Sequence, residues 1–338
     1  MLAKAILAVA PKKVALRDVE IGSVGEWDIK VELEVSAISA GTESYALSST
    51  HSHPGPFVLG YAPVGRVTEV GDRAAALFQI GDRASYFQPR APIDVGQSCG
   101  GHQSPAIFCV DPQGRDPEGS NCYCVRVPAA LSSERAAFGG ISAVACLGVS
   151  LANQNVGDKA LVVGQGMIGQ FAAQHLKLRG AEVAVVDRFE KRLSLSKESG
   201  ADYTIDAGSL DMVEAVRSIW PEGADIVVDT TGSYRAIEAS LDVVRWRGKY
   251  VFLGWCKGKD FNLEKMHNRV FEAYFPWTLE GRRVLSSWRL MQTEVLKVDH
   301  LNTHCFKAGD AQQAYDLIFN APEQFAGVSL EWRDGKQS

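Results

Sequence analysis

The sequence predicts an α/β protein with a β-rich first part and a central part in which strands alternate with helices. Short apolar runs rich in β-branched residues recur between residues 161 and 253, separated by stretches whose apolar residues have helical spacing. This alternation is typical of a doubly wound parallel sheet. Before residue 130 the apolar residues alternate with period two, and Gly-Asp turns stand at 71–72 and 81–82, which indicates barrel or sandwich strands.

The individual elements follow from these periods. Strands are expected in the first part at 4–7, 14–19, 28–37 and 65–70, followed by a helical crossover at 132–151. Central strands are expected at 161–163, 183–186, 203–205, 226–228, 250–253 and 270–275, with helices at 168–178, 212–220 and 234–244. The tail returns to mixed structure with a helix near 311–319. The expected domains are 1–130, 131–275 and 276–338.

A glycine-rich motif, GQGMIG, follows the first central strand. Gly164, Gly166 and Gly169 have the G-x-G-x-x-G spacing that turns the chain out of a strand, admits a pyrophosphate to backbone amides, and lets the next helix pack closely. Such a motif is specific when a strand precedes it, a helix follows it and an acidic residue closes the next strand. We therefore predict a Rossmann dinucleotide-binding domain, in which Met167 and Ile168 also belong to the cofactor site.

The acidic residue that closes the second central strand is Asp187, 18 residues beyond Gly169. A carboxylate at this place accepts hydrogen bonds from the adenosine ribose and repels a 2′-phosphate, which favours NAD over NADP. Arg188 keeps NADP as the less favoured possibility. The alternative is a glycine turn in a flavodoxin-like domain that binds no dinucleotide.

Composition and charge exclude several classes of protein. The chain has 338 residues and a formal charge of -5, and it contains no long basic block, so we expect neither nucleic acid nor an anionic membrane as a partner. It has no run of apolar residues long enough to span a bilayer, and the apolar start is too short for a signal peptide. Seven cysteines, an odd and scattered number, favour reduced thiols in a cytoplasm.

Several segments resemble landmarks of the medium-chain dehydrogenase/reductase superfamily, and together they cover nearly the whole chain. These segments are EVSAISAGTES, FVLGYAPVGRV, GDR, CYCVRVP, VGQGMIGQ and RLSLSKESGAD. Within the superfamily, ISAGTE and GYxxVGRV resemble a zinc-lacking branch with bacteriochlorophyllide dehydrogenases and polyol or sugar dehydrogenase relatives. The resemblance implies a GroES-like catalytic domain at 1–130, a Rossmann NAD-binding domain at 131–275, a C-terminal return to the catalytic domain, and a homodimer formed through the Rossmann edge strand.

The same resemblance bears on catalytic zinc. The positions that match the superfamily's zinc ligands hold Ala40, Tyr61 with Ala62, and Phe138. Since none of these can bind zinc in the usual way, the resemblance implies an enzyme without it.

Structural zinc is not expected either. Four cysteines, at positions 99, 109, 122 and 124, are spaced too irregularly for the superfamily's four-cysteine lobe. Cys99 and His102 have C-x-x-H spacing and could contribute to an irregular metal site, but free thiols and a surface histidine are the favoured interpretation.

Hydride transfer without zinc needs a protein group that takes the hydroxyl proton. The resemblance implies that Thr42 is a relay hydroxyl, that Tyr45 stands where relatives have a relay histidine, and that Glu43 matches a carboxylate that supports a zinc-ligating histidine, now Tyr61. Our hypothesis is that the Tyr61 hydroxyl or the Glu43 carboxylate, with Thr42 as relay, performs the proton transfer. The alternative is that Tyr61 fills the space of the lost metal and Glu43 caps a turn. His51, in the loop SSTHSHPGP, is a further candidate cation or base.

Three more residues complete the predicted cofactor site. By resemblance Arg192 pairs with the adenosine ribose or its phosphate neighbour, and Thr230 and Gly254 follow the fourth and fifth strands, where the fold faces the nicotinamide. The favoured function is a zinc-independent, NAD-linked dehydrogenase of a secondary alcohol on a small sugar-like, polyol or hydroxyethyl-bearing substrate. The alternatives are a reductase of an activated carbon-carbon double bond and a dinucleotide-binding protein without catalysis.

Overall fold

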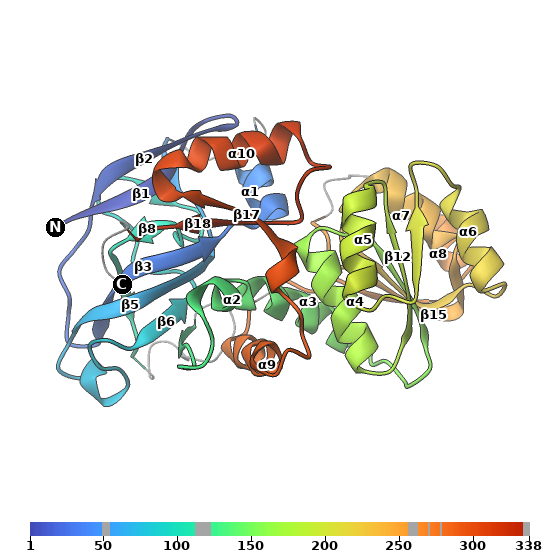
Figure 1. The fold of residues 1–338 in the computed structure, drawn as a ribbon, viewed down its shortest axis with the longest axis horizontal. Coiled ribbons are helices and arrows are strands. Elements are labelled where there is room, and N and C mark those ends of the chain that lie inside the picture. The colour runs from blue at the N-terminus through green and yellow to red at the C-terminus, as the bar shows by residue number, and fades with distance from the viewer. Residues whose placement is uncertain (49–54, 112–122, 256–262, 270, 278, 334–338) are drawn as a thin grey trace. The chain divides into compact units, whose positions relative to one another are not determined.

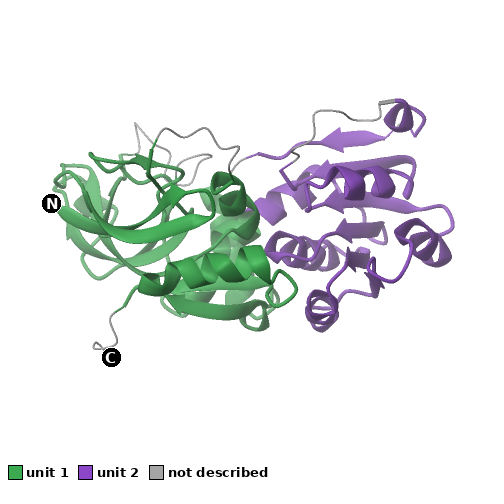
Figure 2. Ribbon diagram, turned by 90° about the horizontal axis from the view of Figure 1, so that it is seen from above, with its two compact units in different colours: residues 1–143, 279–338 green, residues 144–278 purple. Residues whose placement is uncertain are grey.

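The computed structural model describes residues 1–48, 55–111, 123–255, 263–269, 271–277 and 279–333. It divides into two compact units, unit 1 at Met1–Ala143 with Leu279–Ser338, and unit 2 at Val144–Thr278 (Figure 2). Unit 1 is therefore built from both ends of the chain. No helix within the described ranges has the length and apolar character to cross a membrane.

The first sheet of unit 1 has the order β2-β1-β4-β7, with β8 also paired to β1. Its strands are β1 Leu2–Ala10, β2 Lys13–Glu20, β4 Phe57–Val58, β7 Gly96–Gln97 and β8 Gln103–Ser104. The strands expected from the alternation of 4–7 and 14–19 are present as β1 and β2, and they pair antiparallel. The four successive residues 5–8 of β1 are all buried, and two of them, Ala5 and Leu7, pack with Val19 and Val58.

The second sheet of unit 1 has the order β10-β6-β5-β3-β18-β17, with β9 on β3. Its strands are β3 Asp28–Ala37, β5 Ala62–Val70, β6 Arg83–Tyr86, β9 Ala106–Cys109, β10 Cys124–Arg126, β17 Asn302–Lys307 and β18 Gly327–Glu331. β18 pairs with β3, with Ser329 opposite Ala37, so the C-terminal segment enters the sheet just before residue 40 (Figure 1). The prediction of β3 was correct to the residue.

Unit 1 also contains helices. They are α1 Ala40–Ala46, α2 Ser133–Ala137, α9 Gly281–Gln292 and α10 Ala311–Asn320, with short 3-10 turns η1 Ala74–Ala76, η2 Asp299–Leu301 and η3 Ala308–Asp310. Helix α3 Gly139–Leu151 begins in unit 1 and continues past Ala143 into unit 2. The crossover expected as one helix is two, α2 and α3, which are separated by the buried Phe138. α10 lies against α1 and β2, and its Tyr315 and Ile318 pack in a core with Ile38.

Unit 2 contains a six-stranded parallel sheet with the order β13-β12-β11-β14-β15-β16. Its strands are β11 Lys159–Val163, β12 Glu182–Asp187, β13 Tyr203–Asp206, β14 Ala224–Asp229, β15 Val244–Phe252 and β16 Glu272–Tyr274, and its helices are α4 Met167–Leu178, α5 Glu190–Glu198, α6 Met212–Ile219, α7 Tyr234–Leu241 and α8 Leu263–His267. The strand order reverses between β11 and β14, which is the doubly wound arrangement. The predicted fold class is confirmed.

Candidate functional site

The glycine motif of unit 2 has the geometry of a dinucleotide cradle. Gly164 turns the chain out of β11 with φ +90°, a conformation that favours glycine. A Cβ on Gly169 would lie 1.9 Å from the Gly164 carbonyl oxygen, whereas a Cβ on Gly166 would meet nothing within 4 Å. Each glycine thus does what the motif requires. Gly164 turns the chain, Gly166 leaves open space at the start of α4, and Gly169 lets the helix pack against the turn. These residues, with Met167 and Ile168 opening α4, fit a dinucleotide.

Asp187 closes β12 beside this motif. Its Oδ2 accepts a hydrogen bond from the Gln165 amide at 2.7 Å, and its Oδ1 accepts from the amides of Arg188 at 2.8 Å and Phe189 at 3.0 Å. Arg192 Nη1 lies 3.8 Å from Oδ2. The guanidinium carbons of Arg188 and Arg192 lie over the Phe189 ring, 4.9 and 5.0 Å from its centroid. The carboxylate is therefore fixed beside the cradle, and a cationic side chain from α5 stands next to it.

The turn that follows β14 contacts the glycine turn of the cradle, and the turn that follows β15 contacts the turn after β14. Thr230 Oγ1 donates to the carbonyl oxygens of Val163 and Gly164, at 3.0 and 2.9 Å. A Cβ on Gly254 would lie 2.3 Å from the Gly232 amide nitrogen, so the two turns touch through glycines. The hydroxyl of Thr230, predicted to face the cofactor, thus bonds the backbone of the glycine turn.

The hydroxyl groups of unit 1 form a connected path at the start of α1. The Tyr61 hydroxyl donates to Ser39 Oγ at 2.9 Å, and Ser39 Oγ donates to Thr42 Oγ1 at 3.3 Å. Tyr61 is buried, and Thr42 is exposed in the first turn of α1. The path therefore runs from the interior to solvent. Ser39, the middle member, was missed by the sequence reasoning because it stands between strand and helix without a motif of its own.

Glu43 takes part in a second, fully buried network. Its Oε1 accepts from the Ser39 amide at 2.7 Å, and its Oε2 accepts from the Tyr315 hydroxyl and lies 3.1 Å from His102 Nε2. His102 Nδ1 lies 2.9 Å from Ser36 Oγ. The carboxylate that was predicted to support Tyr61 is bound by other groups, and no hydrogen bond joins it to the Tyr61 hydroxyl among the described contacts.

The favoured interpretation of His102 as a surface histidine is wrong. Its side chain has 0% exposure, and its two ring nitrogens lie within hydrogen-bond distance of Ser36 and Glu43. Tyr315 and Trp332, whose Nε1 donates to Ser36 Oγ at 2.8 Å, complete this network from the C-terminal segment. No local pattern signals partners so distant along the chain. The C-x-x-H spacing pointed to His102, but toward a metal rather than toward Glu43.

Tyr45 and His51 are the remaining catalytic candidates. Tyr45 is half-buried on α1, and its carbonyl oxygen accepts from the Ser48 amide at 3.0 Å. His51 lies outside the described residues, as does Cys122.

Burial sets the protonation of the key phenol. Desolvation, reinforced by the charge of Glu43, raises the pKa of Tyr61 well above its usual value although the Ser39 hydrogen bond lowers it. Tyr61 is therefore a neutral phenol near pH 7, able to donate and accept a proton but unsuited to act as a standing phenolate base.

The side chains present do not fit a catalytic zinc ion. Of the three positions that match zinc ligands, Ala40 has no donor atom, Phe138 is an apolar buried ring, and the Tyr61 hydroxyl is engaged by Ser39. Across the described part of the chain, no three His, Cys, Asp or Glu side chains are grouped to hold a metal. Burial and the charge of Glu43 raise the pKa of Cys99 to about 11, so its thiol is protonated near neutral pH.

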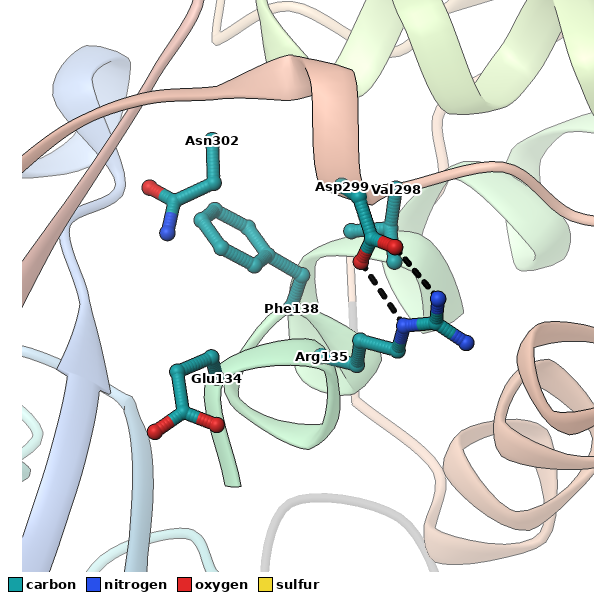
Figure 3. Close-up of a pocket in the computed structure, with 6 residues that line it drawn as sticks. All are labelled: Glu134, Arg135, Phe138, Val298, Asp299 and Asn302. Carbon is teal, nitrogen blue, oxygen red and sulfur yellow. Dashed lines mark hydrogen bonds and ion pairs between the residues drawn. The ribbon is translucent and has the colours of Figure 1, made fainter. Parts of the chain in front are cut away.

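A small cavity of about 200 Å³ lies in unit 1 between α2 and the η2 segment (Figure 3). It is lined by Glu134, Arg135, Phe138, Val298, Asp299 and Asn302. Arg135 Nε donates to Asp299 Oδ1 at 2.7 Å along its wall. The six lining residues include none of the groups of the hydroxyl path, so we assign the cavity no role in proton transfer.

Comparison with known proteins finds similarity to dehydrogenases. Residues 168–301 match the family model described as "Zinc-binding dehydrogenase", a range that excludes positions 40, 61 and 138. The chain is 27% identical to an L-threonine 3-dehydrogenase from Marinomonas sp. (strain MWYL1), covering 96% of this chain and 97% of that protein. It is 26% identical to sorbitol dehydrogenase from Mus musculus, covering 77% of this chain and 76% of that protein.

Solved structures share the fold. One is an oxidoreductase/dehydrogenase of unknown specificity from Escherichia coli, with a TM-score of 0.85 and 22% identity, covering 99% of this chain and 100% of that one. The narrower resemblance to a zinc-lacking branch stays a prediction. The family match, the relatives and the fold together place the chain in the medium-chain dehydrogenase/reductase superfamily.

Proposed function

We propose that the protein is a zinc-independent, NAD-linked dehydrogenase that oxidises a secondary alcohol to a ketone. The observation that carries this proposal is the hydroxyl path from buried Tyr61 through Ser39 to exposed Thr42. Oxidation of an alcohol removes a hydride from carbon and a proton from oxygen. The bound dinucleotide supplies the hydride acceptor, and the path carries the proton.

The proton leaves by successive transfers between hydroxyl groups. Tyr61 accepts the substrate's hydroxyl proton while it passes its own to Ser39, which passes one to Thr42 and so to water. Each hydroxyl both accepts and donates, so no free phenolate is needed and the raised pKa of Tyr61 does not block the step. Run in reverse, the same path returns a proton to a ketone oxygen. Positioned proton transfer of this kind supplies roughly 10²–10⁴-fold of rate.

NAD is the proposed cofactor because Asp187 faces the end of the cradle where the adenosine ribose is expected. A 2′-phosphate at that place would meet the carboxylate, although Arg188 and Arg192 lessen the repulsion.

For the substrate we propose a small sugar-like, polyol or hydroxyethyl-bearing alcohol. The relatives named L-threonine 3-dehydrogenase and sorbitol dehydrogenase support an alcohol of this general kind. The three residues that hold and move the proton, Tyr61, Ser39 and Thr42, place no restriction on the rest of the substrate molecule.

The test is NADH formation with a panel of secondary alcohols, on protein treated with a chelator. We expect turnover to survive, and Tyr61→Phe to lower kcat by roughly 10²–10⁴-fold with little change in the KM for NAD. The control is Tyr86→Phe, which removes another fully buried phenol hydroxyl of unit 1, one without a hydrogen-bond partner. Stoichiometric metal that leaves together with turnover would contradict the proposal.

A second candidate is reduction of an activated carbon-carbon double bond, which the neutral, proton-donating state of Tyr61 favours. Loss of NADH or NADPH with enones, and no NADH formation with alcohols, would select it. Tight dinucleotide binding without turnover on either panel would select the non-catalytic alternative.

We also propose a cytoplasmic homodimer formed through the edge of the unit 2 sheet. β16 is the edge strand, and Phe275 and Trp277 after it are 66% and 70% exposed. Light scattering should give twice the 36.6 kDa chain mass, and Phe275→Ser with Trp277→Ser should give the single chain. A monomeric parent protein would contradict this.

A further inference from the structure

His102 contacts two neighbours of the hydroxyl path: Gly60, which precedes Tyr61, and Glu43, which binds the Ser39 amide. Its ring and the Glu43 carboxylate are 0% and 3% exposed and lie 3.1 Å apart. Burying two ionisable groups costs free energy that a pair of apolar side chains would not. A buried pair such as His102 and Glu43 therefore suits a place where the positions of neighbouring groups matter more than the stability of the fold.

The first contact is with the residue that precedes Tyr61. Gly60 has φ +83°, and a Cβ on it would lie 2.5 Å from the His102 Cγ. The backbone around His102 also bonds this turn: the His102 amide donates to the Leu59 carbonyl at 2.8 Å, and the Gly101 amide donates to the Gly60 carbonyl at 2.7 Å. The imidazole therefore packs against the backbone of Gly60, the residue that precedes Tyr61.

The second contact is through Glu43 to the other end of the path. Glu43 Oε1 accepts from the Ser39 amide at 2.7 Å, and Ser39 and Thr42 flank the start of α1 with Glu43. Movement of the carboxylate would move Ser39, whose hydroxyl joins Tyr61 to Thr42. The joining distances are 2.9 and 3.3 Å, and the longer one is already near the limit of a hydrogen bond.

We propose that His102 is a positioning residue for proton transfer: through Gly60 it places Tyr61, and through Glu43 it places Ser39 and Thr42. In this arrangement the Glu43 carboxyl group is not the base but anchors the turn: its Oε1 accepts from the Ser39 amide, and its Oε2 is held by both His102 and the Tyr315 hydroxyl. This inference rests on the proposed function. Outer partners of this kind typically change activity by about 10–100-fold when they are lost.

The experiment compares two substitutions of the same ring. His102→Gln can still present a donor near Glu43, where Nε2 stands, whereas His102→Asn reaches only toward Ser36, where Nδ1 stands. We expect His102→Asn to lower kcat about 10–100-fold with little change in the KM for NAD, and His102→Gln to recover part of the loss. The solvent deuterium isotope effect on kcat should rise in His102→Asn, since proton transfer becomes slower.

A matched control separates positioning from general loss of stability. Trp288→Phe removes a buried hydrogen bond in the same unit, from Nε1 to the Ala136 carbonyl at 2.9 Å, away from the hydroxyl path. We expect it to lower the melting temperature as His102→Asn does while leaving kcat and the isotope effect unchanged. Equal effects of both variants on kcat, or an unchanged isotope effect in His102→Asn, would overturn the proposal.

A readout without turnover keeps the inference apart from the proposed function. With tyrosine labelled at the carbon that bears the hydroxyl, and Tyr61 identified through Tyr61→Phe, the NMR signal of Tyr61 should shift in His102→Asn and not in Trp288→Phe. If it shifts while the parent protein oxidises no alcohol, the proposed function fails and the placement of Tyr61 by His102 stands. If it does not shift, the placement is wrong whatever the activity.

Discussion

Asp187 combines two duties in one side chain. Its carboxylate bonds three backbone amides around the cradle, and its charge faces the expected site of the ribose. Replacing Asp187 by Asn keeps one oxygen, which can still accept from the amides of Arg188 and Phe189, but it loses the acceptor for the Gln165 amide and removes the charge. We expect Asp187→Asn to reduce the preference for NAD over NADP, measured as the ratio of kcat/KM values, by about tenfold or more, because about 1.4 kcal/mol of repulsion would be relieved. An unchanged ratio would show that the cofactor is selected elsewhere.

Glu34 offers a prediction on pH at the same scale. Burial alone would raise the pKa of Glu34, but the hydrogen bond from Ser133 and the charges of Arg333 and Arg66 outweigh it and hold the pKa below the ordinary 4.5. Because the folded pKa is the lower one, the stabilisation is present above about pH 4.5 and is lost as the pH falls through the folded value.

Glu34→Gln should accordingly lower the free energy of unfolding by about 1–3 kcal/mol at pH 7. The difference from the parent protein should shrink below about pH 4.5, which denaturant titrations at several pH values would measure. A difference independent of pH would mean that shape, rather than charge, matters at this position.

Among the elements, the turn from β11 into α4 allows a paired test. Gly169→Ala places a Cβ 1.9 Å from a carbonyl oxygen, so we expect loss of both stability and dinucleotide binding. Gly166→Ala meets no atom within 4 Å, so the melting temperature should hold while affinity for the dinucleotide falls. Calorimetric binding and thermal melting of both variants provide the measurement. Equal affinity in Gly166→Ala and the parent would place the pyrophosphate elsewhere.

The elements also show how far local patterns reach. β3 could be predicted from its period-two alternation, and the strands of unit 2 from short apolar runs bounded by turns. α1 and α9 were not predicted: α1 is only seven residues long, and its AGTESYA lacks a helical apolar stripe. Helix α9 has one, with Val284, Trp288 and Met291 buried, but its charged residues masked the period. Tertiary packing, rather than propensity, fixes both.

At the scale of the molecule, dinucleotide binding should stabilise unit 2. A ligand at 100 times its Kd adds about 2.7 kcal/mol to the free energy of unfolding, which slows exchange of globally protected amides about 100-fold. We expect hydrogen exchange with NAD to slow in β11, β12 and α4 of unit 2. Slowing confined to unit 1 would contradict the assignment of the cradle.

The candidate site divides in the same way between what sequence can and cannot predict. The cradle is nearly continuous, from Gly164 to Asp187, and its parts were predicted because the motif is local. The hydroxyl path and its buried support draw on distant segments: Tyr315 meets Glu43 across 272 positions, and Trp332 meets Ser36 across 296. Such pairings depend on the order of strands in a sheet, which one sequence does not reveal.

The placement of β18 beside β3 has a consequence for biosynthesis. Unit 2 is continuous in the chain, so it can fold as soon as the ribosome has released it. By contrast, β3 gains its neighbour β18 only when residues 327–331 have emerged. Until then the nascent protein carries an unpaired strand edge and a carboxylate that awaits Tyr315. Tyr315 and residues 327–331 therefore complete the support of α1 and the pairing of β3 only after the whole of unit 2 has been synthesised.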